Sequence, residues 1–184
     1  MASAFSHAAA ALALGTAFWR PALPTRFWVL GAICAVLPDL DVIAFRVGIP
    51  YEHVLGHRGL SHSLFFAALL AVAVVALFFS REQQHWGRLW LFFFLATASH
   101  ALLDALTTGG LGVALFAPLE NSRYFFPWRP IEVSPLSVSR FFSARGLAVL
   151  RSELLWVWLP ALVFAVAVLL WRRGHRSPPR SLAA

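Results

Sequence analysis

The chain has 184 residues, of which 60% are hydrophobic and only 12% are charged, and its mean hydropathy is +0.73. Soluble domains average about 25% charged residues, and a domain of this size keeps too much surface to hide so much apolar side chain. The composition therefore excludes an ordinary soluble domain and indicates a membrane protein.

The net charge of +7 comes from fifteen arginines against eight acidic residues, and the chain contains no lysine. The absence of lysine excludes Schiff-base chemistry and a P-loop. The arginines lie between and beyond apolar runs rather than along a basic stripe, so we expect no nucleic-acid partner. The single cysteine, Cys34, excludes an intramolecular disulfide and a metal site built from cysteines.

Five apolar segments follow one another along the chain and predict an all-α fold, a polytopic membrane helical bundle. They are Ala2–Trp19, Phe27–Leu37, Leu60–Phe79, Leu89–Leu106 and Leu154–Trp171. A spanning helix needs about 20 residues, and all of the segments except the second have or approach that length. The second segment stops at Pro38, which predicts a short or broken helix buried among the others, and Pro160 is a candidate kink in the fifth.

We predict one membrane-embedded helical domain over residues 1–171 and a disordered, Arg-rich tail over 172–184. The connector 107–153 is rich in glycine and proline and carries five arginines, which favours a partly irregular lid at the membrane interface. No arginine precedes the first segment, whereas four follow the fifth. This asymmetry predicts an N-terminus on the outer face of the membrane and a cytoplasmic C-terminus.

Seven ionisable side chains lie within or at the ends of the apolar segments or close before them. They are His7, Asp39, Asp41, His57, His62, His100 and Asp104. With five spans, the start of the first segment, the end of the second, the start of the third and the end of the fourth reach the same membrane face. Ionisable groups at membrane depth cost about 2.5–3.5 kcal/mol each and mark functional sites. The sequence therefore predicts one polar site at the outer face.

Imidazoles and carboxylates are the ligands that zinc, manganese and iron take in proteins. His100 and Asp104 are four residues apart and share a helix face, whereas His57 and His62 need a bend in order to converge. We predict one or two divalent ions held by the seven residues, with zinc as the expected ion and manganese or iron as alternatives. Taken singly, each residue also has a structural explanation, such as a packed histidine or a helix cap.

Four motifs in this order resemble the YdjM family (DUF457) of bacterial and archaeal inner-membrane proteins, which are described as predicted membrane-bound metal-dependent hydrolases. The motifs are Ser6-His7, Leu37-Pro38-Asp39-Leu40-Asp41, His57-Arg58-Gly59-Leu60-Ser61-His62-Ser63 and Ser99-His100-x-x-Leu103-Asp104-x-x-Thr107-Thr108-x-Gly110. The resemblance covers about residues 1–140 and implies a multi-pass protein of the inner (plasma) membrane.

Through that family the chain more distantly resembles zinc-dependent phospholipase C and P1-type nucleases. By motif order, the places of their ligands fall on His7, Asp39 or Asp41, His57 or His62, and His100 with Asp104. The later histidine and H-x-x-x-E pair that complete a three-zinc site have no counterpart here. The resemblance therefore implies one or two ions, with Asp104 as the bridge between them.

The leading hypothesis is hydrolysis of a phosphoester in a lipid or membrane-adjacent substrate by metal-activated water. Asp41 and His62 are the candidate catalytic residues, Asp41 as the acceptor of the water proton. Arg58 is the candidate for binding the substrate phosphate. Membrane lipid is the expected partner. Two alternatives stay open: a metal or proton transporter, and a non-catalytic partner-binding membrane protein whose metal holds its helices together.

Overall fold

The computed structural model describes residues 1–18, 23–135 and 141–175. Within these ranges the protein is helical and contains no β-strand, only the isolated bridges Thr107–Ile131 and Val113–Tyr124. The predicted all-α class is confirmed.

The longer helices are α1 (Ala4–Phe18), α2 (Thr25–Val36), α4 (Leu64–Phe78), α5 (Trp86–Ala105), α7 (Ala144–Glu153) and α8 (Leu159–Gly174). Shorter turns join them: η1 (Leu37–Val42), α3 (Ile43–Arg46), η2 (Leu60–His62), η3 (Gln83–His85) and the π-helical turn η4 (Leu154–Trp158).

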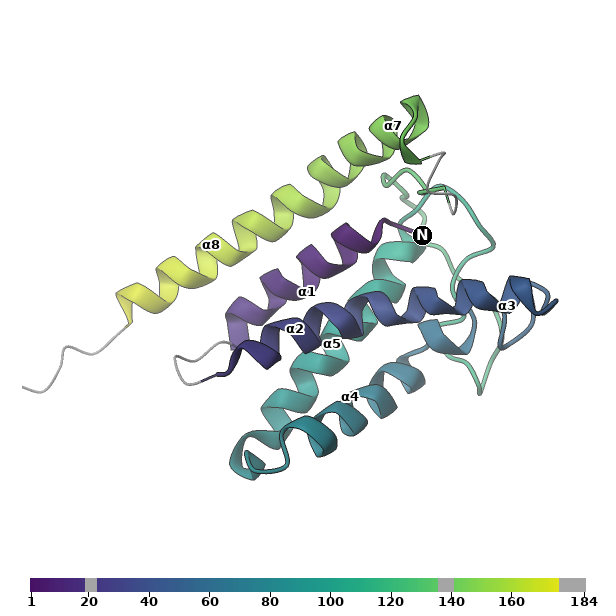
Figure 1. Ribbon diagram of the computed structural model, residues 1–184. Coiled ribbons are helices and arrows are strands. Elements are labelled where there is room, and N and C mark those ends of the chain that lie inside the picture. The colour runs from purple at the N-terminus through teal and green to yellow at the C-terminus, as the bar shows by residue number, and fades with distance from the viewer. Residues whose placement is uncertain (19–22, 136–140, 176–184) are drawn as a thin grey trace, which may run out of the picture.

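Helix α5 is the centre of the bundle and packs against α1, α2 and α4, while α8 lies on the outside against α1 (Figure 1). The long helices alternate in direction. The first turn of α1, the end of α2 with η1, the start of α4 and the last turn of α5 therefore meet at one end of the molecule, together with α7 and the N-terminus. We call this end, with residues 4–7, 37–42, 60–64 and 100–107, the polar end.

Aromatic side chains from three elements form the centre of the hydrophobic core. Phe27 of α2, Phe92 and Phe93 of α5, and Phe79 after α4 are buried, and the rings of Phe27 and Phe92 stack with centroids 4.2 Å apart. Full burial of such a side chain contributes about 1.5–3 kcal/mol. This core holds the helices that carry the polar end.

The second apolar segment is longer than predicted. Helical structure continues through Pro38 as one run from Thr25 to Arg46, 22 residues long. Pro38 occupies the first turn of η1, where its missing N–H removes no helical hydrogen bond. Of the two predicted alternatives, a short or a broken helix, the structure has the break, as a change from α-helix to 3₁₀-helix, in a run longer than the predicted segment.

The last helix also begins earlier than predicted. The helices α7, η4 and α8 form one continuous run, Ala144–Gly174, of 31 residues. The Ser143 side chain accepts the N–H of Arg145 and starts the run, so the irregular connector predicted to reach residue 153 ends ten residues sooner. The π-helical turn η4 directly precedes the stretch of α8 that contains Pro160 in its first turn.

Only two helices in the described ranges are long and apolar enough to cross a membrane by length and composition: Thr25–Arg46 and Ala144–Gly174. Helices α1 and α4 have 15 residues each, fewer than predicted, because the chain before each of them is not α-helical. The predicted tail is helical as far as Gly174, contrary to expectation, and its residues 176–184 lie outside the described ranges.

Candidate metal centre

The polar end brings together side chains from four separate stretches of the chain. His7 lies in the first turn of α1, Asp39 and Asp41 lie in η1, His62 ends η2, and His100 and Asp104 lie near the end of α5. His57 belongs to the loop before η2. All seven predicted residues therefore lie at one end of the bundle.

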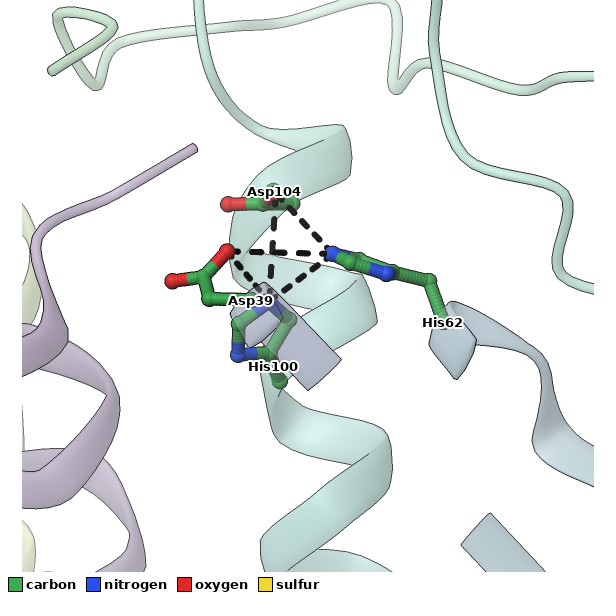
Figure 2. A group of neighbouring side chains, drawn as sticks. All are labelled: Asp39, His62, His100 and Asp104. Carbon is green, nitrogen blue, oxygen red and sulfur yellow. Dashed lines mark hydrogen bonds and ion pairs between the residues drawn. The ribbon is translucent and has the colours of Figure 1, made fainter. Parts of the chain in front are cut away.

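Four of these residues form a compact cluster, in which one ligand atom of each lies within 4.8 Å of the others (Figure 2). The cluster consists of Asp39, His62, His100 and Asp104, all buried. The Nε2 atom of His100 lies 3.4 Å from Asp39 Oδ1 and 3.0 Å from Nε2 of His62. Asp104 Oδ2 lies 3.6 Å from Nε2 of His62 and 4.0 Å from Nε2 of His100.

The carboxylates in the cluster have unsatisfied oxygen atoms. Both oxygens of Asp39 are buried without a hydrogen-bond partner, and Oδ2 of Asp104 has only the ion pair with Arg58 Nε at 2.9 Å. A buried acceptor left unsatisfied costs about 1–3 kcal/mol, more when it is charged. A cation between these oxygens and the two Nε2 atoms would remove that cost. Two carboxylates and two imidazoles are a ligand set for zinc, manganese or iron, so the residues fit a divalent ion.

Both histidines of the cluster are oriented through their other nitrogen. His100 Nδ1 lies 2.7 Å from the backbone oxygen of Ala35, and His62 Nδ1 lies 3.0 Å from Asp41 Oδ2. An Nδ1–H donated to these acceptors leaves each Nε2 lone pair directed into the cluster. Metal-binding histidines in proteins are held in this way by a carbonyl or a carboxylate.

Asp41 differs from Asp39 in having a full set of partners. Its Oδ1 lies 2.5 Å from His57 Nδ1, and its Oδ2 accepts the N–H of Arg58 at 3.0 Å and the hydroxyl of Ser61 at 2.6 Å. Asp41, His57 and His62 form a second group with metal-ligand spacing. The two groups share His62, whose Nε2 faces the four-residue cluster and whose Nδ1 faces Asp41.

His7 borders the cluster from α1. Its ring stacks on the ring of His100 with centroids 3.7 Å apart, and its Nε2 lies 3.5 Å from Asp104 Oδ1. Both ring nitrogens are buried and have no hydrogen-bond partner. Asp104 therefore presents Oδ2 to the cluster and Oδ1 to His7, so it lies between the cluster and the His7 imidazole.

Arg58 is fully buried and faces Asp104 rather than solvent. Its Nε lies 2.9 Å from Asp104 Oδ2, and its terminal nitrogens donate to the backbone oxygen of Gly109 and to Thr107 Oγ1. Its backbone has a φ of 61°, the left-handed region that non-glycine residues rarely adopt. Such strain persists only where the surroundings fix it, as the bonds to Asp41 and Asp104 do here.

Arg123 and Tyr51 hold the loop that carries His57. The Arg123 guanidinium donates to the backbone oxygens of Tyr51 and His57, at 2.7 and 2.9 Å. Burial raises the pKa of Tyr51 above its usual value, so the phenol stays neutral beside the ring of His57. Arg123 is thus engaged with the backbone of this loop.

Sequence reasoning missed two further contacts to the site. The backbone N–H of Ala2 donates to Asp104 Oδ1 at 2.8 Å. The carboxylate of Glu153 is fully buried against the start of α1. An acidic residue directly before an apolar run is the sequence signal that could have drawn attention to it.

The profile of the family described as YdjM inner membrane protein matches residues 1–176. The chain belongs to this family. Inner membrane protein YbcI of Escherichia coli (strain K12) is 41% identical over 175 residues, which cover 94% of this chain and 99% of that protein. No solved structure matches the chain. The resemblance inferred from the four motifs is thus confirmed, and the match to the YdjM family extends beyond them into α8.

Proposed function

We propose that this YdjM-family protein is a metal-dependent hydrolase of the inner membrane that cleaves a phosphoester in a lipid or membrane-adjacent substrate. The observation that carries the proposal is the buried cluster in which the carboxylates of Asp39 and Asp104 face the Nε2 atoms of His62 and His100, with neither oxygen of Asp39 hydrogen-bonded. The inner-membrane relative and the apolar helices support the location.

The chemistry requires one or two divalent ions, zinc by preference, which when bound supply hydroxide by lowering the pKa of water towards about 7. Asp39, His62, His100 and Asp104 hold the first ion, and His7 with Asp104 borders a second position. Asp41 and His57 keep His62 in the required tautomer. In this scheme Arg58 supports the charge of Asp104, and binding of a substrate phosphate requires its guanidinium to leave Asp104 and Thr107.

We also propose that all five long helical runs cross the membrane, with the polar end and the N-terminus outside and the C-terminus in the cytoplasm. The two long runs set the thickness, and the shorter α1 and α4 are continued at the polar end by polar chain segments. The centre then lies near the headgroups of one leaflet, where an amphiphilic substrate can reach it.

A closed, structural metal site is the second candidate function. The observation in its favour is the burial of all four cluster residues, because four protein ligands fill a tetrahedral zinc site and a catalytic ion keeps an open position. In that case the ion fastens η1, η2 and α5 together, and the protein acts by binding a partner.

The test combines metal analysis with an activity screen on detergent-purified protein. We expect wild type to carry about one or two ions per chain and to hydrolyse at least one substrate in a panel of phosphodiesters and phospholipids. Asp39→Ala should lose both, because Asp39 has no role except towards the cluster. Glu52→Ala, which removes an exposed carboxylate in a nearby loop, is the matched control and should keep both.

Other outcomes separate the alternatives. Bound metal without turnover, together with a large loss of thermal stability on chelation, supports the structural site. Metal-dependent flux in proteoliposomes without turnover supports a transporter. A wild-type protein that retains no metal in zinc-, manganese- and iron-supplemented preparations contradicts the whole proposal.

A further inference from the structure

Glu153 is a fully buried carboxylate that the proposed chemistry does not use. It ends α7, and its two oxygens accept three hydrogen bonds from the start of α1: from Ser3 N–H at 2.5 Å, Ser3 Oγ at 2.5 Å and Ser6 Oγ at 2.8 Å. Among the described residues, no basic side chain forms an ion pair with it. All the described hydrogen bonds of this carboxylate therefore go to one short segment at the start of α1.

That segment touches the metal centre on its other side. The N–H of Ala2 donates to Asp104 Oδ1, and the His7 Nε2 lies 3.5 Å from the same oxygen. The ring of His7 also stacks on His100. Residues 2–7 thus connect Glu153 to two members of the four-residue cluster.

The local structure of the last helix supports the same connection. The π-helical turn η4 begins directly after Glu153 and ends at Trp158, whose indole N–H donates to Ser6 Oγ at 2.7 Å. The side chains of Glu153 and Trp158 therefore both hydrogen-bond to the hydroxyl of Ser6. Single π-helical turns inside α-helices occur frequently at functional sites.

Burying the Glu153 carboxylate between two helices is unfavourable, because a carboxylate at membrane depth costs more free energy than an apolar side chain of similar size. The other buried residues of this long helical run are Gly146, Val149 and Val157, none of which offers a side-chain hydrogen-bond acceptor to α1. A carboxylate offers what an apolar side chain does not: a fixed set of acceptors that sets the position and rotation of the first turn of α1.

We propose that Glu153 is a positioning residue of the metal centre, which holds residues 2–7 so that the Ala2 N–H and the His7 ring meet Asp104. The inference rests on the proposed function, since it requires the cluster to bind an ion. The outer helix α7–α8 thereby has a role in the site, although it lies far from the proposed ligands in the sequence.

The test uses Co²⁺ as a spectroscopic probe on the full-length protein in detergent. In Glu153→Gln, an amide replaces one acceptor oxygen with a donor that faces the Ser3 donors. We expect Co²⁺ affinity to fall about tenfold, the lower end of what outer contacts to metal ligands contribute, and the d–d absorption bands to change. Glu82→Gln, a carboxylate paired with Arg26 at the opposite end of the bundle, is the matched control and should leave both unchanged.

Ser6→Ala gives a second, milder variant, because it removes one donor to Glu153 and the acceptor of Trp158. We expect it to change affinity and spectrum in the same direction as Glu153→Gln, by less. If Glu153→Gln does not fold, the Co²⁺ affinity and absorption spectrum of Ser6→Ala test the inference instead.

A merely structural Glu153 has a different signature: a lower thermal midpoint with wild-type affinity and spectrum in the folded fraction. That result overturns the inference and leaves the proposed function standing. A wild-type protein that binds no Co²⁺ overturns both.

Discussion

Two carboxylates in the same 3₁₀ turn, Asp39 and Asp41, have opposite surroundings. Asp41 accepts hydrogen bonds from a hydroxyl and a backbone N–H and contacts two imidazoles, whereas Asp39 is buried with no hydrogen-bond partner at all. In a folded protein an isolated buried carboxylate is stable only beside a compensating charge. Under the proposed function, Asp39 is therefore the carboxylate that faces the cation, and Asp41 is the one that orients the ligand His62.

This difference predicts distinct effects of two equivalent substitutions. Asp39→Asn should remove bound zinc, because a neutral amide oxygen is a weak ligand. Asp41→Asn should keep zinc at saturation but lower the affinity by about 10–100-fold, because His62 loses the acceptor that fixes its tautomer. Metal analysis and chelator competition measure the two quantities. Equal loss of stoichiometry in both variants would instead make Asp41 a direct ligand.

Arg58 gives a second prediction, about stability. In the metal-free protein, Arg58→Met leaves Asp104 without its nearest positive side chain, and breaking a buried ion pair by removing one partner costs about 3–5 kcal/mol. Added zinc should recover part of this loss, because a ligand that binds only the folded state stabilises it. Denaturation with and without zinc checks this. Wild-type stability combined with a raised KM would favour direct contact between Arg58 and substrate.

Much of the candidate site was predictable from residue type and order. Histidines and aspartates in apolar segments are costly, so their positions were informative, and alternation of the helices brought them to one end. The separate environments of Asp39 and Asp41 were not predictable, because they depend on Ser61 and on the backbone of Arg58. The burial of Arg58 was not predictable either, since its partners Thr107 and Gly109 lie about fifty residues away in the sequence.

At the scale of helices, the predicted bounds of two segments differ from the structure. Pro38 was interpreted as the end of a segment, yet a proline in the first turn of a new helical stretch loses no bond, and the chain continues to Arg46. The last helix was predicted to start at Leu154, and the preceding ten residues are mixed in polarity. Those residues form α7, whose buried face includes Gly146, Val149 and Glu153. Hydropathy alone does not detect a helix that buries only one side at its start.

Close packing between α2 and α5 gives a prediction about fold stability. A Cβ atom at Gly31 would lie 2.6 Å from Cζ of Phe92, whose ring is held by its stack on Phe27. Gly31→Ala should therefore destabilise the protein by about 1–3 kcal/mol, as overpacking does, without changing its metal content. Gly87→Ala is the control in α5, where a Cβ meets open space and the substitution should be neutral or slightly stabilising. Thermal melts in detergent distinguish them, and equal midpoints would contradict the packing.

For the molecule as a whole, the two ends of the bundle carry different kinds of positive charge. At the end away from the metal centre, Arg88 and Arg172 donate to the backbone oxygens at the end of α1, and Arg26 pairs with Glu82. Cations satisfy helix C-termini favourably. At the polar end, Arg58 and Arg145 are paired with acids. Both ends therefore carry arginines and both carry an arginine paired with an acid, so the difference between them is the pair Arg88 and Arg172 at the end of α1.

We therefore propose that the end that carries Arg88 and Arg172 is cytoplasmic and that the polar end is external. Three reporter positions test it: after Ala184, within the turn Arg81–Gln83 between α4 and α5, and within the exposed connector near Asn121. A fluorescent protein should be fluorescent at the first two, and alkaline phosphatase should be active only at the third. Reversal of all three would keep the five spans and move the metal centre to the cytoplasm. If the connector and the C-terminus instead share a side, the last helix does not cross the membrane, and the proposal of five spans is wrong.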